Sequence, residues 1–299
     1  MRALEACWPS SERVIATPPQ RRALGPWLQL APTLLYFAVV FIGPLILLVA
    51  YSLFTFRDFQ YVPELTTRNY VEILTSPAFR LIFARTAAIA LVVTLVVLLV
   101  AYPFVYIVTF VLPQRGQTVY FLVLVTLFGS YLARIYAWRT ILGSEGVINS
   151  SLMGLGAIDE PLKFLLNSPF AVVIALTNFL IPLAVLPIYS AMQNVSPGLL
   201  EAGRDLGGGR MQVLRGIVLP LTLPGVRVAA AFTFIAAASD YATPTLLGGP
   251  IGRMAGGAIV QEFSSTLDWP LGAALAMTLV VLLVIMVGLL SLVVGWLAR

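Results

Sequence analysis

The chain has 299 residues, of which 60% are hydrophobic and 10% are charged, and its formal net charge is +5. Soluble domains average about 25% charged residues, so this composition indicates an integral membrane protein. The 18 basic residues are scattered along the sequence, which fits the orientation of membrane spans better than binding to nucleic acid.

Histidine is absent from the sequence, and cysteine and lysine occur once each. The chain has no histidine and one cysteine, Cys7, which excludes an internal disulfide, a cysteine-based metal cluster and Ser-His catalysis. Its only lysine, Lys163, does not follow the Gly-x-x-x-x-Gly pattern of a phosphate-binding loop. We therefore predict a conduit that is not an enzyme and that binds no metal or cofactor itself.

Polar sequence precedes the first apolar segment. We predict that residues 1–27 form a cytoplasmic tail, because the apolar segment after them is too long for the hydrophobic part of a cleaved signal peptide. Crossing the ~30 Å hydrocarbon core takes about 20 apolar residues in a helix. Six segments reach that length, which predicts transmembrane helices at about 28–54, 86–112, 118–141, 169–191, 221–240 and 271–297.

The connecting segments differ between the two sides of the membrane. An even number of spans places both ends of the chain on one side, together with the segment between the fourth and fifth spans. Lys and Arg show only a weak bias toward that side. The segments on the other side are longer, at about 55–85, 142–168 and 241–270. The last is predicted to hold a short helix at about 255–265, which would suit a re-entrant or lid-like element.

Residues 196–220 form a polar, glycine-containing island between two apolar segments. Ser196 is a suitable N-cap with Pro197 at the first helical position, and Gly207 to Gly209 interrupt the chain before a second helix. One arc of that second helix carries apolar side chains, namely Met211, Val213, Leu214, Ile217 and Val218. The pattern predicts a helix, a turn and a surface helix that docks through this arc.

The spacing of residues in this island resembles the EAA loop of bacterial ABC importer permeases. The matching residues are Glu201-Ala202-Gly203, Gly207, Ile217 and Leu219-Pro220. The resemblance implies a cytoplasmic loop that fits a cleft in an ATP-hydrolysing subunit, with the coupling residues Glu201, Ala202, Gly203, Arg204, Asp205, Gly207 and Arg210. Gly203 departs from the pattern, because the family usually has a second alanine there. The alternative is an ordinary amphipathic surface loop.

Three ionisable residues fall at or near membrane depth, where a charge costs at least ~2.5–3.5 kcal/mol on insertion scales. Arg134 and Arg139 lie near the outward end of the third predicted span, where they either snorkel to the interface or have a structural or path-lining role. Asp240 ends the fifth span next to Tyr241. A carboxylate beside an aromatic ring can bind a cation by charge and by the ring face, so we predict that this pair lines the path of a cationic substrate.

The same segments resemble the polyamine branch of these permeases. The matching stretches are Arg134 to Trp138 with Glu145-Gly146, Asn149 and Leu152, then Asp240 to Pro244 with Leu247 to Gly249, and Asp268 to Pro270 with Gly272 to Ala274. The resemblance covers about 85–295 and implies putrescine or spermidine as substrate. The candidate path residues are Asp240, Tyr241, Thr243, Tyr136, Trp138, Arg134 and Trp269.

Taken over the whole chain, the resemblance implies an all-α membrane protein with six spans and the type I (MetI-like) ABC importer permease fold. Its permease domain would be 28–297, with the type-1 ABC transmembrane domain at about 82–295 and the coupling loop at 196–220. The implied partners are a second homologous permease, two ATPase subunits that bind ATP and Mg²⁺, and an extracytoplasmic solute-binding protein. The implied location is the bacterial inner membrane, with both termini cytoplasmic.

Two other functions stay open from the sequence. Within the same class, an anionic or metal-chelate substrate would place Arg134 and Arg139 at the path. Outside it, a stand-alone channel or proton-coupled carrier would use Asp240 as a proton relay, although neither would need the EAA-like island.

Overall fold

The computed structural model describes residues 24–57, 60–62 and 64–296, so most of the predicted tail lies outside the described residues. The chain divides into two compact units, residues 1–47 and 48–299, which are described separately. In the first unit, α1 (Leu24–Phe37) runs through a π-helical turn, η1 (Ala38–Ile42), into α2 (Gly43–Ser52), whose residues from Leu48 on belong to the second unit. The segment Gln29–Ser52 is long and apolar enough to cross a membrane, in agreement with the first predicted span.

The second unit consists mainly of helices. One short hairpin joins β1 (Thr55–Arg57) to β2 (Gln60–Val62) in antiparallel register, with Phe56 opposite Tyr61. The long helices are α4 (Pro77–Tyr106), α8 (Pro169–Gln193), α11 (Leu219–Ser239) and α14 (Trp269–Trp296). Shorter helices connect them: α3 (Arg68–Thr75), η2 (Ile107–Val111), α5 (Pro113–Val125), η3 (Thr126–Phe128), α6 (Tyr131–Leu142), α7 (Val147–Gly154), η4 (Lys163–Leu165), α9 (Pro197–Asp205), α10 (Arg210–Val213), η5 (Leu214–Val218), α12 (Ala242–Leu247), α13 (Ala255–Gln261) and η6 (Glu262–Thr266).

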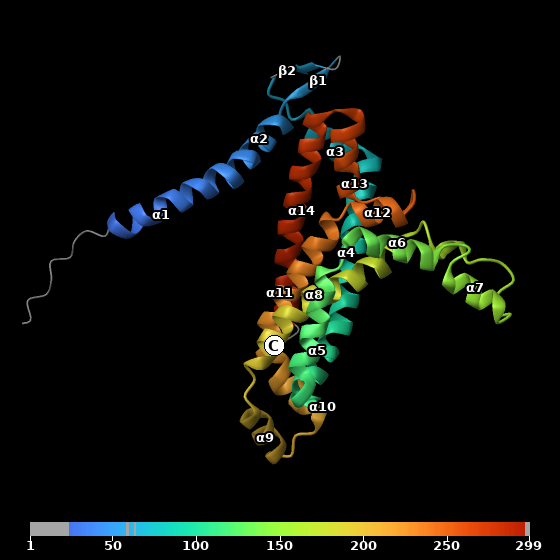
Figure 1. Ribbon diagram of the computed structural model, residues 1–299. Helices are drawn as coiled ribbons and strands as arrows, with labels where there is room; N and C mark the ends of the chain where they lie inside the picture. Colours follow the sequence, from blue (N-terminus) through green and yellow to red (C-terminus); the bar gives the residue numbers. More distant parts are fainter. Residues whose placement is uncertain (1–23, 58–59, 63, 297–299) are drawn as a thin grey trace, which may run out of the picture. The chain divides into compact units, whose positions relative to one another are not determined.

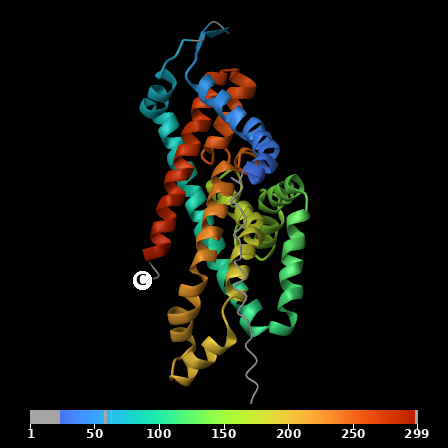
Figure 2. The same ribbon diagram turned by 90° about the vertical axis from the view of Figure 1, so that its left-hand side faces the viewer.

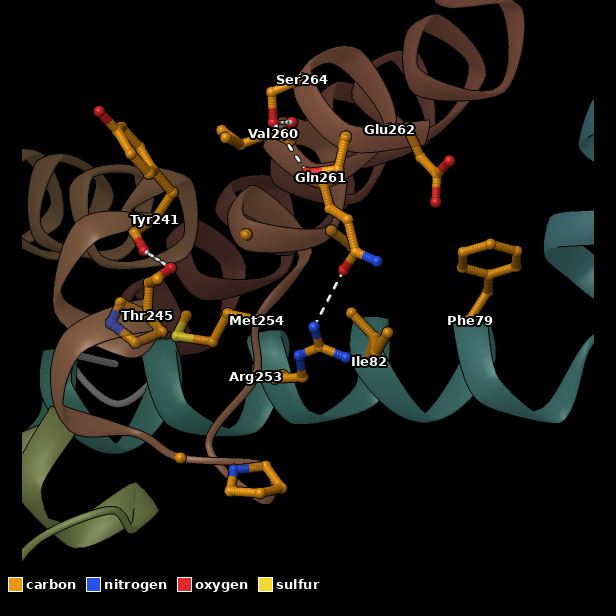
Figure 3. A pocket seen from close by; sticks show the side chains of 16 residues that line it. Phe79, Ile82, Tyr241, Thr245, Arg253, Met254, Val260, Gln261, Glu262 and Ser264 are labelled. Atoms are coloured by element: carbon orange, nitrogen blue, oxygen red, sulfur yellow. Dashed lines mark hydrogen bonds between the residues drawn. The ribbon is translucent and has the colours of Figure 1, made fainter. Parts of the chain in front are cut away.

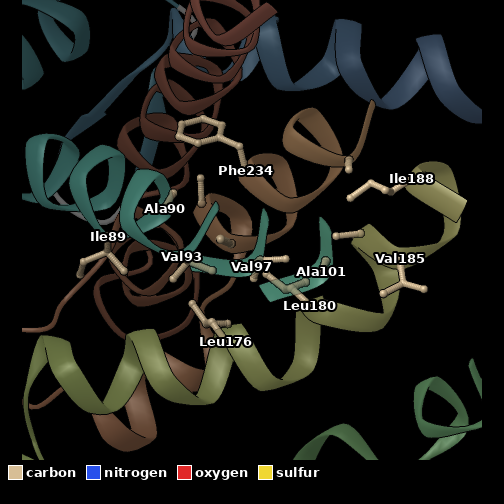
Figure 4. Close-up of a cluster of buried hydrophobic side chains, with 14 of the residues drawn as sticks. Ile89, Ala90, Val93, Val97, Ala101, Leu176, Leu180, Val185, Ile188 and Phe234 are labelled. Atoms are coloured by element: carbon tan, nitrogen blue, oxygen red, sulfur yellow. The ribbon is translucent and has the colours of Figure 1, made fainter. Parts of the chain in front are cut away.

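The core of the second unit lies where α4, α8 and α11 pack together (Figure 4). Each of the three helices contributes small, fully buried side chains, such as Ala101, Ala184 and Ala237. Phe234 of α11 is the largest fully buried side chain of the described residues and belongs to this cluster. Small residues let helix backbones approach closely, which stabilises helix pairs in a lipid environment. These three helices therefore form the frame that holds the two ends of the unit.

The two ends of the second unit are built from different elements (Figures 1 and 2). The hairpin, α3 and α13 lie together at one end, which we call the hairpin end. α9 and α10 lie at the opposite end, which we call the loop end. This separation agrees with the prediction that 55–85 and 241–270 lie on the opposite side of the membrane from 196–220.

The third predicted span, 118–141, is wrong as a single helix. α5 and η3 end at Phe128, α6 begins at Tyr131, and the two segments meet at 92°. The break lies at Gly129, which is extended, and at Ser130, whose hydroxyl accepts a hydrogen bond from the N–H of Ala133 and caps α6. Within the described part of the chain, five single helical segments are long and apolar enough to span a membrane, and the bent pair makes a sixth if it counts as one span.

The fifth span begins earlier than the predicted 221–240. α10, η5 and α11 form one continuous helical segment, Arg210–Ser239. The π-helical turn η5 ends directly before α11, in which Pro220 is the second residue. Proline lacks the N–H that an α-helix uses, and local π-helical adjustment satisfies the freed carbonyl groups. The second half of the polar island is thus continuous with a transmembrane helix.

Short helices follow α11 at the hairpin end. α12 comes directly after α11, and α13 continues into η6, so the helix predicted at about 255–265 is present. The N–H of Ala255 donates to the buried Oγ1 of Thr86 on α4 at 2.8 Å. A Cβ atom on Gly256 would lie 3.0 Å from the carbonyl oxygen of Asp240. These two close contacts fix α13 against α4 and against the end of α11.

Candidate translocation pocket and coupling loop

A cavity of about 850 Å³ lies at the hairpin end, between the start of α4, α12 and the α13–η6 segment (Figure 3). Phe79 and Ile82 come from α4, while Tyr241 stands at the start of α12. In the view of Figure 3, Tyr241 and Glu262 lie on opposite sides of the cavity. The contacts that fix α13 therefore also set the width of this cavity.

Two charged side chains line the cavity. Arg253 donates a hydrogen bond from Nη2 to Oε1 of Gln261 at 2.9 Å. Burial raises the pKa of Glu262 above its ordinary value of 4.5; a hydrogen bond with Thr266 opposes this, and the nearby carboxylates of Asp268 and Glu72 raise it further. A carboxylate whose charged form is destabilised in this way gains from a bound cation.

Glu262 was not among the predicted site residues. It lies with Gln261 in a segment between two spans that is otherwise rich in glycine and apolar residues. The segment holds two carboxylates, Glu262 and Asp268, and a charged residue in such a segment is a signal that the sequence does contain. Only the structure shows that Glu262 faces the same cavity as Tyr241.

Asp240 and Thr243 lie beside this cavity and hold α12 in place. The two carboxylate oxygens of Asp240 accept hydrogen bonds from the N–H groups of Ala242 at 3.1 Å and Thr243 at 3.3 Å. Thr243 is buried, and its hydroxyl shares a 2.7 Å hydrogen bond with the hydroxyl of Tyr131 on α6. Of these predicted path residues, only Tyr241 lines the cavity, and its side chain is 52% exposed. A path role for Asp240 and Thr243 stays a prediction.

Arg134 lies at the bend between η3 and α6. Its guanidinium donates from Nη2 to the carbonyl oxygen of Thr126 and lies 5.3 Å from the ring centroid of Phe179 on α8. The last carbonyl groups of a helix carry partial negative charge, and a guanidinium over an aromatic face adds a cation–π attraction. Arg134 therefore has a structural role at the bend, whatever its part in transport.

The other predicted path residues are spread over different surroundings. On α6, Tyr136 and Arg139 are exposed, whereas Trp138 packs against a buried cluster. Trp269, the first residue of α14, contacts Phe263 edge to face with ring centroids 6.0 Å apart. The second unit alone does not gather these residues into one cavity, so a path that joins them stays a prediction.

The predicted coupling loop forms the loop end. α9 begins at Pro197 as predicted, but the hydroxyl of Ser196 makes no capping hydrogen bond, so the expected side-chain cap is wrong. Gly207 has φ +83°, a conformation that glycine adopts without strain. After this turn, Oε1 of Gln212 accepts a hydrogen bond from the N–H of Gly209 at 2.8 Å and caps α10. The predicted helix, turn and helix are therefore present with a different set of caps.

The loop exposes both charged and apolar side chains. The charged residues and the neighbouring alanine of the predicted coupling set are exposed, namely Glu201, Ala202, Arg204, Asp205 and Arg210. Val213 and Val218 of the predicted apolar arc are buried, whereas Met211 is 57% exposed, so docking of the whole arc stays a prediction. Leu206 is 90% exposed in the turn. Large apolar side chains among charges are typical of a surface that another protein covers.

Apolar helices with a pocket at one end and an amphipathic loop at the other define a membrane transport subunit. Comparison with known sequences is more specific, because the chain belongs to the family of binding-protein-dependent transport system inner membrane components, whose profile matches residues 104–299. The chain is therefore a permease subunit of an ABC importer, a multi-pass inner-membrane protein and not an enzyme.

Several curated relatives resemble most of the chain. The spermidine/putrescine transport system permease protein PotB of Haemophilus influenzae is 31% identical over 256 residues, which cover 85% of this chain and 87% of the relative. PotB of Escherichia coli is 30% identical over 243 residues, covering 81% and 88%. The inner membrane ABC transporter permease protein YdcU of Escherichia coli is 30% identical over 275 residues, covering 87% of each.

Solved structures share the fold. A chain of a bacterial ABC transporter involved in the import of the acidic polysaccharide alginate superposes with a TM-score of 0.73 at 17% identity, covering 92% of this chain and 96% of that one. A chain of the bacterial alginate transporter in complex with a pentasaccharide-bound periplasmic protein gives 0.71 at 18% identity, covering 92% and 93%. At this level of identity the likeness concerns the fold alone, and it confirms the predicted all-α importer permease fold.

Proposed function

We propose that this permease carries a polyamine, with putrescine and spermidine as the expected substrates. The observation that carries the proposal is that the half-buried Glu262 and the aromatic Tyr241 line the same cavity. The similarity to the PotB permeases, about 30% over most of both chains, supports the same substrate class.

The chemistry of the cavity suits a chain with an ammonium group at each end. The carboxylate of Glu262 would attract one ammonium group, and the face of Tyr241 would bind another through a cation–π contact. Phe79, Ile82 and Met254 supply an apolar wall for the methylene groups between the charges. Arg253 is held by Gln261, so its guanidinium has a partner other than Glu262.

The importer would contain the partners that the sequence implies. The exposed charges of the 196–220 loop would dock in a cleft of an ATPase subunit. The importer would have two such subunits, and these would bind ATP and Mg²⁺. A second homologous permease would complete the path, and a solute-binding protein would deliver substrate at the hairpin end. In this arrangement the loop end and both termini would lie in the cytoplasm. The permease domain would comprise residues 28–297, with its type-1 core at about 82–295. The opposite positions of hairpin and loop support this arrangement (Figure 1).

The test is ATP hydrolysis by the reconstituted complex of both permeases, the ATPase subunits and the binding protein. The panel contains putrescine, spermidine, an amino acid and an iron chelate. Stimulation by a polyamine, together with its loss in Glu262→Gln, supports the proposal. Stimulation by an anionic compound instead would overturn it and would favour the alternative in which Arg134 and Arg139 serve the path.

A further inference from the structure

Two cavities meet at the loop end of the second unit, between α5, η2 and α8. One has about 650 Å³ and the other about 310 Å³. Gln117, Tyr189 and Gln193 line both of them, so the two cavities share one wall. The smaller cavity also reaches Pro197, the first residue of α9. This cavity pair therefore lies directly beside the coupling loop.

The shared wall is polar but carries no charge. Gln117 and Gln193 contribute amide groups to it, and Gln114 adds a third in the larger cavity, where Tyr120 and Tyr189 stack with ring centroids 4.0 Å apart and an interplanar angle of 14°. Among the described lining residues of both cavities, none is Asp, Glu, Lys or Arg. The pocket at the hairpin end differs, because Glu262 and Arg253 line it.

Thr109 adds an independent observation. It lies in the wall of the smaller cavity, within the π-helical turn η2. Its Oγ1 is buried and has no hydrogen-bond partner among the described residues. Buried hydroxyl groups are normally paired, and π-helical turns occur frequently at functional sites. The π-helical turn thus places, in the wall of the smaller cavity, a hydroxyl that has no partner among the described residues.

We propose that this cavity pair is the release site of the permease, where a protonated amine pauses on the amide oxygens of Gln117 and Gln193 and on the ring of Tyr189 before it enters the cytoplasm. The inference rests on the proposed polyamine function and names the place at which the same substrate leaves. A transport path needs sites that bind well enough to admit an ion and weakly enough to let it go. Uncharged amide and aromatic groups meet the second condition, whereas a carboxylate would retain a dication.

The experiment measures inhibition of uptake by substrate on the inner side. The whole importer is reconstituted in vesicles loaded with increasing putrescine, and uptake of labelled putrescine gives the internal concentration that halves the rate. Gln193→Glu and Gln117→Glu place a negative charge in the wall without a change of shape. We expect them to lower that concentration by about tenfold. Gln193→Lys and Gln117→Lys should raise it and slow uptake, because they repel the cation.

Matched controls separate a binding role from a structural one. Asn194 follows Gln193 directly, is exposed and lines neither cavity, so Asn194→Asp and Asn194→Lys should leave the inhibitory concentration within about twofold of the parent. Shifts of opposite sign for Glu and Lys at Gln117 and Gln193 support the release site. Shifts of the same sign, or no shift, would overturn it.

A second set of variants keeps the test independent of the introduced charges. Tyr189→Phe preserves the ring face and should retain the parent's inner affinity, whereas Tyr189→Leu should weaken it by about three- to tenfold. Equal behaviour of the two variants would also count against the site. Failure of the polyamine proposal shows itself separately, because the parent complex would then show no polyamine-stimulated ATP hydrolysis.

Discussion

Gly203 in α9 lies against the tip of Ile217 in η5, so closely that a Cβ atom on Gly203 would stand 2.6 Å from Cδ1 of Ile217. Real Cβ atoms do not approach other heavy atoms to that distance. The tip of the Ile217 side chain thus fills the space that a side chain at position 203 would enter. This close contact packs α9 directly against the second helical segment of the coupling loop.

The first prediction follows from this contact. Gly203→Ala should lower substrate-stimulated ATP hydrolysis by no more than a few-fold, because the new Cβ atom meets the flexible tip of the Ile217 side chain, which must shift to make room. Ile217→Val removes the Cδ1 atom, so the double variant should recover most of the activity. A double variant that is worse than Gly203→Ala alone would contradict the contact. Hydrolysis by the reconstituted complex measures all three.

How much of this loop the sequence could predict depends on the kind of signal. Helix, turn and helix followed from Pro197 and the glycines at 207–209, because these residues act on their own backbone. The Gly203–Ile217 contact joins two different helical segments on either side of the turn. A glycine that departs from a motif does not show in the sequence which side chain it contacts. The helical wheel likewise gave the apolar arc but not which of its side chains are buried, since a wheel shows no neighbour.

The membrane part shows the same limit. Hydropathy located the spans well, because length and apolar content determine them. It missed the 92° bend at Gly129 and Ser130, because both halves are apolar and the window averages over them. The sequence and the resemblance also grouped Tyr241, Trp138 and Trp269 as candidate path residues, whereas of these three only Tyr241 lines the cavity at the hairpin end. Which helix faces meet depends on tertiary packing. In a uniformly apolar helix the sequence has no hydrophobic periodicity, so it does not show which face is buried.

The second prediction concerns the crossing of α8 and α11. A Cβ atom on Gly225 would lie 2.5 Å from the carbonyl oxygen of Pro187 and 2.5 Å from Cβ of Ala191. Gly225→Ala should therefore destabilise the protein by about 1–3 kcal/mol, because a backbone oxygen cannot move aside as a flexible side chain can. Thermal unfolding of the purified permease in detergent measures the loss as a lower Tm.

Gly288 is the matched control for this substitution. It lies in the middle of α14, and a Cβ atom there would meet nothing within 4 Å. Gly288→Ala should leave Tm unchanged or raise it slightly, because alanine favours the helix by about 0.5–1 kcal/mol. Equal effects of the two substitutions would show that the α8–α11 contact is looser than the structure indicates.

The third prediction is a pH dependence set by Glu262. Burial raises its pKa above 4.5, so the carboxylate takes up a proton as the pH falls through that raised value. Polyamine uptake should then decline at a pH above the ordinary range of glutamate, because the neutral acid no longer attracts an ammonium group. Glu262→Gln should show low uptake that no longer varies over this range, while Glu64→Gln, a change of an exposed carboxylate elsewhere at the hairpin end, should keep the parent's profile.

The sign of the stability effect separates this decline from unfolding. A native pKa above the unfolded value means that the folded protein binds this proton more tightly. The contribution of Glu262 to stability is therefore complete at low pH and is lost as the pH rises through the raised pKa. Uptake and stability should move in opposite directions across this window. A parallel fall of both at low pH would attribute the decline to other groups.

The fourth prediction tests the coupling loop. Arg204 and Arg210 are exposed on either side of the glycine turn. Reversing both charges with Arg204→Glu and Arg210→Glu should lower substrate-stimulated ATP hydrolysis by at least about tenfold. The two arginines would attract the surface of the ATPase subunit, and glutamates in their place would repel it. Membrane insertion should be unaffected. Arg115→Glu reverses an exposed charge in another segment of the same chain and serves as the control; normal stimulated hydrolysis in the double variant would exclude the loop from coupling.

The last prediction separates two roles of Asp240. Its carboxylate caps α12 through the N–H groups of Ala242 and Thr243, and the sequence also assigns it to the cation path. Asp240→Asn retains an oxygen for capping but removes the charge, so it should keep Tm close to that of the parent and lower polyamine uptake by a few-fold. Asp240→Ala removes both, and loss of the cap should cost about 0.5–2 kcal/mol in addition.

The comparison of these two variants decides between the roles. If the carboxylate serves only α12, Asp240→Asn will transport every cation as the parent does, and Asp240→Ala will lose stability and uptake together. If it also faces the path, uptake will fall in both variants while Tm falls only in the second. Because Thr243 is tied to Tyr131 on α6, a loosened α12 would also disturb the bend beside Arg134, and Tm of Asp240→Ala should report that loss as well.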